Sequence, residues 1–159
     1  YNDFIMQLGG KRFGHGLFNS FSKDNVKKWT EIVSEAYPEF QNLFKIFGYD
    51  WLGRCFGIDL RKSTYGNILM FEIGTNDVLE IPCTFDKFLN EEIPLYADAC
   101  LAKSFFDEWM NNFGKSIVYG RCAGYKVPLF LGGEDSVNNL EDSDMEVYWS
   151  VLTQVKSRL

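Results

Sequence analysis

The sequence contains very little of what most catalytic and metal sites are built from. It has a single histidine, His15, and its four cysteines stand far apart, so that no CxxC pair exists. A zinc site, a Ser-His-Asp triad or a Cys-His pair would therefore depend on His15 alone, which sits between glycines with no nucleophile motif beside it. We interpret His15 as a surface or turn histidine, and we expect no catalytic residue, no metal and no cofactor.

Three further absences exclude whole classes of protein. No apolar run approaches the roughly 20 residues that a transmembrane helix needs. No run rich in lysine and arginine is present, and the formal net charge of −6 opposes the neutralisation of phosphates. The glycines form pairs such as Gly132-Gly133, which predict tight turns, and not the spaced motifs of nucleotide-binding loops. Direct binding to nucleic acid and insertion into a membrane are both unexpected.

The four cysteines lie among apolar residues in a chain long enough to form its own core. They are Cys55, Cys83, Cys100 and Cys122. Two disulfides are the alternative that this count allows, but a buried free cysteine behaves as a small hydrophobic residue. We expect reduced thiols and a cytoplasmic protein. The sequence starts at Tyr1 and not at Met, so a preceding segment or a removed signal peptide would not be visible in it.

Aromatic side chains are abundant, with 15 Phe, 8 Tyr and 4 Trp among 159 residues. This composition excludes an intrinsically disordered chain and fits a single domain over residues 1–159. Short apolar runs predict strands over residues 54–60, 67–73 and 78–82, the last two joined by a hairpin turn at residues 74–77. The middle run is continuously apolar, which predicts a strand that is covered on both faces.

One helix is predicted before these strands. It starts after Ser22, the expected N-cap, and ends before Pro38. The aromatic residues after this break fit either a further helix over residues 40–47, ended by Gly48, or a strand near Phe44.

Three helices are predicted in the second half of the chain. Thr84 caps a short one, and a longer one covers residues 96–113, where apolar side chains share one stripe. The last helix starts at a capping box, in which the Ser143 oxygen and the Glu146 carboxylate each accept a bond from a backbone N–H group. The fold class that follows is α+β, with a small, mostly antiparallel sheet packed by three to four helices.

We expect one contiguous hydrophobic core. Its members lie on the apolar stripe of a predicted helix or in a β-like run. They are Trp29, Phe56, Leu69, Phe71, Phe106, Trp109, Phe130, Tyr148 and Leu152.

The acidic charge is concentrated in the second half. Residues 1–79 hold nine basic and nine acidic residues, whereas residues 80–159 hold seven and thirteen. No basic residue lies between Lys126 and Lys156, and six acids fall in this gap. They are Glu134, Asp135, Glu141, Asp142, Asp144 and Glu146. Because complementary charges speed encounter and select partners, an acidic protein without a catalytic constellation is expected to bind a basic protein.

Paired carboxylates are the remaining basis for an enzyme. Acids adjacent in sequence point apart on a regular element, whereas acid–base catalysis needs two carboxylates that face one substrate. Asp59 and Glu72 lie on neighbouring predicted strands, loosely as in a metal-dependent nuclease, but Gly74 stands where that chemistry requires a lysine. A small hydrolase with a site near Glu134 and Asp135 stays open as an alternative.

Several segments, taken together, resemble those of one known protein family. The first two are Phe47-Gly48-Tyr49-Asp50-Trp51-Leu52-Gly53-Arg54 and Val78-Leu79-Glu80-Ile81-Pro82-Cys83. The longest is Cys122-Ala123-Gly124-Tyr125-Lys126-Val127-Pro128-Leu129-Phe130-Leu131-Gly132-Gly133-Glu134-Asp135, continued by Asn139-Leu140-Glu141 and Ser143-Asp144-Met145-Glu146-Val147-Tyr148-Trp149. Together they resemble the C-terminal immunity domain of the Tdi-type immunity proteins of bacterial type VI secretion systems.

This resemblance is strongest over residues 47–155, and residues 1–46 are expected to form the N-terminal portion of the same domain. Residues 9–21 are only loosely similar to the upstream region of the family, which often carries a GAD-like domain. The resemblance implies a cytoplasmic, non-catalytic protein that binds and neutralises a cognate secreted toxin, typically a DNase. A generic interaction module of the SMI1/KNR4-like kind is a second alternative.

A nuclease attracts phosphate with a basic cleft, and an acidic protein can occupy such a cleft as a mimic of nucleic acid. We therefore predict a toxin-binding face made of acids from the gap without basic residues. These acids are Glu134, Asp135, Glu141, Asp142 and Asp144. Glu146 is set aside, because the capping box gives its carboxylate a structural role.

Overall fold

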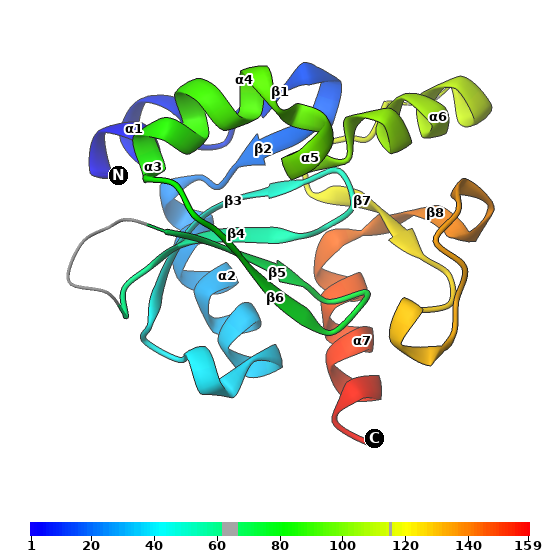
Figure 1. Cartoon of the computed structure of the whole chain (residues 1–159). Coiled ribbons are helices and arrows are strands. Elements are labelled where there is room, and N and C mark those ends of the chain that lie inside the picture. Colours follow the sequence, from blue (N-terminus) through cyan, green and yellow to red (C-terminus); the bar gives the residue numbers. More distant parts are fainter. Residues whose placement is uncertain (62–66, 115) are drawn as a thin grey trace.

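A six-stranded antiparallel sheet runs through the middle of the molecule, with helices on both of its faces (Figure 1). The computed structural model describes residues 1–61, 67–114 and 116–159. The strands are β1 (Arg12–Phe13), β2 (Phe18–Ser20), β3 (Phe44–Asp50), β4 (Cys55–Asp59), β5 (Ile68–Glu72), β6 (Asp77–Ile81), β7 (Arg121–Tyr125) and β8 (Leu140–Asp144). The helices are α1 (Asn2–Leu8), α2 (Lys23–Ala36), α3 (Phe85–Lys87), α4 (Ile93–Leu95), α5 (Ala97–Leu101), α6 (Lys103–Phe113) and α7 (Met145–Lys156). Single turns of 3-10 or π geometry are η1 (Gly14–Gly16), η2 (Pro38–Phe40), η3 (Phe88–Glu92), η4 (Leu129–Leu131) and η5 (Val137–Asn139).

The sheet has the simplest antiparallel topology, because each strand from β1 to β6 pairs with the next one along the chain. β7 and β8 form a separate two-stranded sheet beside α7 (Figure 1). The predicted α+β class and the three predicted strands are confirmed, each within one residue of the expected ends. The turn between β5 and β6 lies where it was expected, and Asn76 adopts a positive φ of 61° there.

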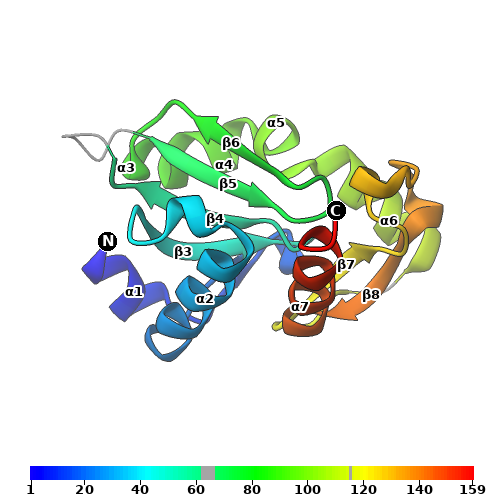
Figure 2. The same cartoon turned by 90° about the horizontal axis from the view of Figure 1, so that it is seen from below.

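The sheet divides the hydrophobic core into two clusters, one on each face. α1 and the helices from α3 to α6 cover one face, and α2 and α7 cover the other, as Figures 1 and 2 show together. Alternate residues of β5 belong to different clusters: Ile68 and Met70 to the first, Leu69 and Phe71 to the second. All four are buried, so β5 is covered on both faces, as its apolar run predicts.

The prediction of one contiguous core is therefore wrong, because the sheet separates the buried residues into two clusters. Phe56, Phe106 and Trp109 lie in the first cluster. The second cluster contains Trp29, Leu69, Phe71, Tyr148 and Leu152. Phe130 is half-buried and belongs to neither cluster. A periodic pattern identifies buried side chains, but it does not say on which face of a sheet they lie.

Two predicted helices differ from the structure. Residues 44–50 form strand β3, so the strand near Phe44 is the correct alternative. Its buried side chains are divided between the two clusters, and the register of its pairing with β4 shifts between Ile46 and Gly48. The long helix over residues 96–113 is interrupted at Ala102, which adopts the left-handed conformation (φ 52°, ψ 49°) and separates α5 from α6. Gly114 ends α6 with φ 58°, as expected of a C-terminal glycine.

Helix α7 begins one residue later than predicted. Its N-cap is Asp144, whose carboxylate accepts a bond from the N–H of Val147 at 2.9 Å, and Ser143 belongs to β8. Both residue types cap helices well, so the sequence alone does not choose between them. Glu146 is therefore not part of a capping box; it forms an ion pair with Lys28 of α2 at 2.6 Å.

The four cysteines are all free thiols, and only Cys83 is not buried. Within the described ranges, no helix combines the length and the apolar composition that crossing a bilayer requires.

Candidate binding surface

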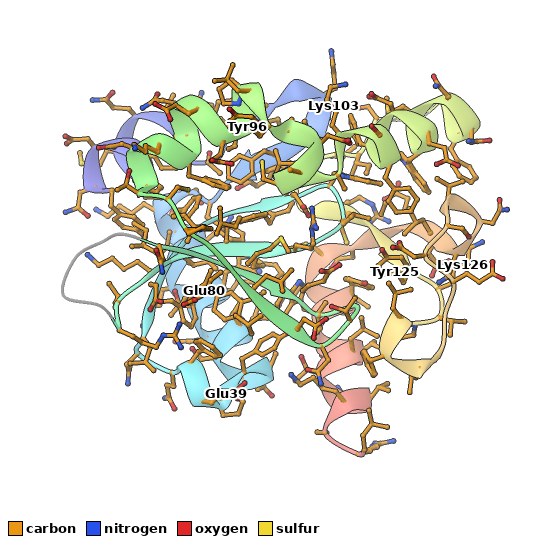
Figure 3. All side chains as sticks on the ribbon, viewed as in Figure 1. Glu39, Glu80, Tyr96, Lys103, Tyr125 and Lys126 are labelled. Atoms are coloured by element: carbon orange, nitrogen blue, oxygen red, sulfur yellow. The ribbon has the colours of Figure 1, made fainter. Side chains whose placement is uncertain are left out.

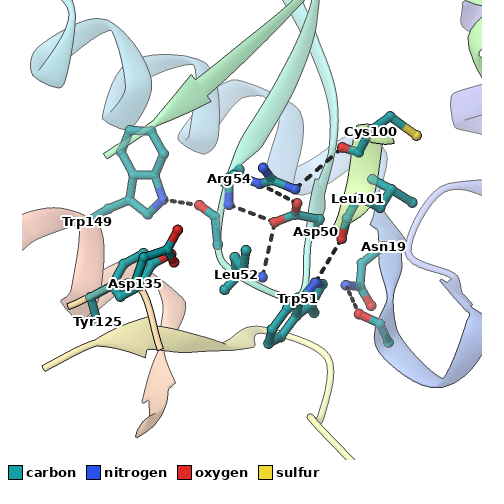
Figure 4. Close-up of polar contacts among 12 residues, drawn as sticks. Asn19, Asp50, Trp51, Leu52, Arg54, Cys100, Leu101, Tyr125, Asp135 and Trp149 are labelled. Carbon is teal, nitrogen blue, oxygen red and sulfur yellow. Dashed lines mark hydrogen bonds and ion pairs between the residues drawn. The ribbon is translucent and has the colours of Figure 1, made fainter. Parts of the chain in front are cut away.

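The turn between β3 and β4 is organised by one buried carboxylate (Figure 4). Asp50 is fully buried, and its Oδ1 accepts bonds from the backbone N–H groups of Leu52 (3.1 Å) and Arg54 (3.0 Å). Its Oδ2 accepts a third bond from Nε of Arg54 at 2.6 Å. Such a short contact between oppositely charged groups is a strong, charge-assisted hydrogen bond. The turn is thus held by side-chain and main-chain bonds to a single residue.

Both helical layers and the β7–β8 sheet are anchored to this turn. The indole Nε1 of Trp51 donates to the carbonyl oxygen of Leu101 at 2.9 Å, on the side of α5. The indole Nε1 of Trp149 in α7 donates to the carbonyl oxygen of Gly53 at 2.8 Å. The N–H of Ala123 in β7 donates to the carbonyl oxygen of Trp51 at 2.7 Å. The turn therefore fixes where α7 and β7 lie relative to the large sheet.

The electrostatics around the turn extend to the loop that follows β7. Burial opposes the charge of Arg54, but the carboxylates of Asp50 and Glu72 outweigh it, so that the pKa of Arg54 is raised. The pKa of Glu72 is raised above its usual value, chiefly by burial and further by Asp50, Asp135 and Asp77, in spite of the attraction of Arg54. The negative charge of Glu72, at the end of β5, and that of Asp135, on the loop, therefore repel each other.

The β7–β8 hairpin lies against α7 with no space between them. Gly124 faces the ring of Tyr148, since a Cβ atom there would lie 2.7 Å from the ring carbons. The Tyr148 hydroxyl accepts a bond from the N–H of Tyr125 at 3.3 Å. Glu141 pairs with Gly124, so its side chain lies on the α7 side of the hairpin, whereas Asp142, one residue on, lies on the opposite side.

The loop between β7 and β8 is tightly ordered by Asn139. Its Oδ1 accepts a bond from the N–H of Val127 (3.0 Å), and its Nδ2 donates to the carbonyl oxygens of Val127 (2.9 Å) and Glu134 (2.8 Å). At Gly133 a Cβ atom would lie 1.9 Å from the Val127 carbonyl oxygen, so only glycine fits. The loop is anchored to the β5–β6 turn, where the Gly74 carbonyl oxygen accepts a bond from the N–H of Leu129 at 2.8 Å.

Three of the five acids predicted to meet a toxin have partners within the protein. Tyr125, which is labelled in Figure 3, donates its hydroxyl hydrogen to Asp135 at 2.8 Å, and the two side chains lie close together in Figure 4. Burial, together with this carboxylate, raises the pKa of Tyr125. Asp142 forms an ion pair with Arg121 of β7 at 2.7 Å. Asp144 is the N-cap of α7. These acids stabilise the hairpin and its junction with α7.

The other two predicted acids, Glu134 and Glu141, are exposed. In the part of the chain that the structure describes, neither carboxylate has a hydrogen bond or an ion pair with another residue. Both belong to the hairpin, Glu134 to its loop and Glu141 to β8. They are the members of the predicted acidic face whose charge is available to a partner.

The other arrangements considered from the sequence do not assemble a site. Asp59 and Glu72 lie at opposite ends of the β4–β5 pair, because Cys55 pairs with Phe71 and Asp59 lies beside Asn67. The two carboxylates are thus separated by about five residues along a strand, roughly 16 Å. Among the described residues, no group of three His, Cys, Asp or Glu side chains is placed to hold a metal ion. His15 is exposed, in a turn with φ 59°.

Two features of this surface are not indicated by residue types alone. The Asp50–Arg54 pair and the role of Asn139 both lie in segments that carry the family resemblance, and this was the only signal in the sequence that marked them. Neither residue belongs to a catalytic or metal motif, and their partners are identified only by the folded backbone.

The fold and the hairpin together define a small acidic α+β protein with a rigid, glycine-containing loop on its surface. Residues 84–156 match the family described as "T6SS immunity protein Tdi1, C-terminal", which is the family that the sequence resembles. The match contains α6, the β7–β8 hairpin and α7. The 50–54 turn and the segment over residues 78–83 precede it.

A solved structure is similar over nearly the whole chain. The crystal structure of Atu4351 from Agrobacterium tumefaciens matches with a TM-score of 0.68 and 21% sequence identity, covering 97% of this chain and 74% of that one. At this identity the likeness establishes the shared fold. No curated protein matches the sequence.

Proposed function

We propose that this chain is an immunity protein that neutralises a cognate type VI secretion toxin by binding it. The match of residues 84–156 to the Tdi1 C-terminal family carries this proposal. The toxin is a nuclease with a basic cleft, and the binding takes place in the cytoplasm, where the toxin would otherwise reach the DNA. The chain acts by occupying a surface of the toxin and catalyses no reaction.

The distribution of charge supports a basic partner. The net charge of −6 arises entirely in residues 80–159, which include the hairpin and α7. Complementary charge across an interface increases the rate of encounter by about 10- to 1000-fold at low salt. The acidic face consists of Glu134 and Glu141, whose exposed carboxylates have no partner among the described residues, with Asp135, Asp142 and Asp144 adding to the field and holding the hairpin in shape.

The proposal is tested with the toxin encoded beside this gene in its genome of origin. Production of that toxin should arrest a bacterial host, and co-production of this chain should restore growth. In solution, nuclease activity should fall in proportion to added protein and vanish at about one equivalent, as tight one-to-one binding requires. Failure to restore growth, with both proteins present and folded, would contradict the proposal.

A charge-reversal experiment tests the acidic face. Replacing Glu134 and Glu141 by lysine changes the net charge from −6 to −2, because each replacement adds two charges. We expect association to slow by about tenfold or more at low salt and much less at high salt. The same change at Glu31 and Glu35, which are exposed on α2, is the matched control and should slow association far less. Equal effects of the two pairs would place the binding face elsewhere.

A further inference from the structure

A groove of about 330 Å³ opens beside the Gly132-Gly133 pair, in the loop between β7 and β8. We call it the diglycine groove. It is lined by Val127, Gly132, Gly133, Glu134, Asn138 and Asn139. Its position in the hairpin loop places it within the proposed acidic face.

The diglycine groove is preformed. Asn139 joins its two walls, since its side-chain amide bonds to the backbone of Val127 on one side and to the carbonyl oxygen of Glu134 on the other. Backbone bonds from Gly132 N–H to Leu129 and from Gly133 N–H to Pro128 hold its floor at 3.0 and 3.1 Å. A groove that is already ordered loses little conformational entropy when a ligand enters it.

The chemistry of the lining favours a cation on an aliphatic stem. The Glu134 carboxylate is exposed and has no partner among the described residues, and the exposed part of Val127 offers apolar surface beside it. Lys126, the nearest lysine in sequence, donates its Nζ to the carbonyl oxygen of Asn138 at 3.1 Å and does not pair with Glu134. Lysine and arginine combine an apolar stem with a charged end, and both bind carboxylates.

We propose that the diglycine groove receives one basic side chain of the toxin, whose charged end pairs with Glu134 and whose stem lies against Val127. This inference rests on the proposed function, because it identifies the feature of the toxin that the hairpin recognises. It assigns to Glu134 a role different from that of Glu141. Glu134 holds a bound group in place, whereas Glu141 contributes only to the long-range field.

The experiment compares Glu134→Gln with Glu141→Gln, which make the same change in charge and size. The probe is the toxin encoded by the neighbouring gene, with its catalytic residues disabled, and the measurement is binding kinetics at about 0.05 M and about 0.5 M salt. Glu134→Gln should increase the dissociation rate by about tenfold at both salt concentrations, as loss of a desolvated charge pair does. Glu141→Gln should alter only the association rate, and only at low salt.

A second variant tests the groove without changing any charge. Val127→Trp fills the groove and should raise the dissociation rate in the same way. On the toxin, one arginine or lysine should give no further loss when it is replaced together with Glu134. If Glu134→Gln behaves like Glu141→Gln and Val127→Trp binds normally, the groove assignment is overturned while the immunity function stands. Failure of the unmodified protein to bind would overturn the proposed function, and this inference with it.

Discussion

Removing the Asp50 carboxylate should destabilise the protein more than any other single change in charge that we consider. Asp50 is fully buried and the side chain of Arg54 is 11% exposed. In Asp50→Ala the guanidinium stays buried without its counter-ion, which typically costs about 3–5 kcal/mol. The N–H groups of Leu52 and Arg54 also lose their acceptor, which places the expected cost at the upper end of that range. This is a large fraction of the 5–15 kcal/mol typical of the free energy of unfolding.

The measurement is urea unfolding followed by far-ultraviolet circular dichroism at neutral pH. Arg54→Met should cost a similar amount, and the double variant should cost less than the sum, because it leaves no unpaired charge behind. The Lys103–Asp107 pair is the matched control, since it has the same i, i+4 spacing and an N–O distance of 2.8 Å, but is half exposed. Asp107→Ala should cost only about 0.3–0.5 kcal/mol. A cost below about 1 kcal/mol for Asp50→Ala, or additive costs in the double variant, would refute the reasoning.

Three further changes test other parts of the structure. Burial raises the pKa of Glu72 in the folded protein, so the contribution of Glu72 to stability is complete at low pH and is lost as the pH rises through that pKa. Glu72→Gln should therefore raise the melting temperature at neutral pH and have no effect below about pH 4. Gly124→Ala places a methyl group against the buried ring of Tyr148 and should lower the free energy of unfolding by about 1–3 kcal/mol in urea titrations. Among the four thiols, Cys83 should react first with a thiol reagent under native conditions, and the other three should react rapidly only after denaturation. Melting at unchanged temperature for Glu72→Gln, full stability for Gly124→Ala, or rapid reaction of all thiols in the native protein would contradict these expectations.

The elements that could be predicted are those in which a local sequence signal, such as a helix cap or a turn residue, coincides with a pattern of buried apolar residues. Helix α2 begins after Ser22 because the serine oxygen accepts a bond from the Asn25 N–H at 3.3 Å, as a short polar side chain before a helical pattern predicts. The strands β4, β5 and β6 combine apolar runs with a turn whose Asn76 tolerates a positive φ.

The features that could not be predicted depend on contacts that only the folded chain brings together. Alanine is the best helix former, so nothing at Ala102 signals a break; the break is accompanied by a bond from the Ser104 N–H to the Asp98 carboxylate at 2.7 Å. β8 is missed because acidic residues disfavour strands, and it forms because β7 supplies its backbone bonds and Arg121 pairs with Asp142.

The candidate site was predicted in composition but not in detail. All five acids lie on the β7–β8 hairpin or at its junction with α7. The sequence does not reveal that Asp135 is held by Tyr125, or that Asp144 caps α7 in place of Ser143. Charge patterning shows where negative charge accumulates, but only the folded backbone shows which carboxylates already have a partner.

The division of the core between the two faces of the sheet has a spectroscopic consequence. All four tryptophans are buried. Trp29 and Trp149 lie on one side of the sheet and pack edge to face, with their ring centroids 6.2 Å apart. Trp51 and Trp109 lie on the other side. The emission of the native protein therefore combines two non-polar environments separated by the sheet. Replacing one pair by phenylalanine leaves indoles that report on a single layer, so the two reciprocal variants would reveal which layer admits water first as the protein is heated.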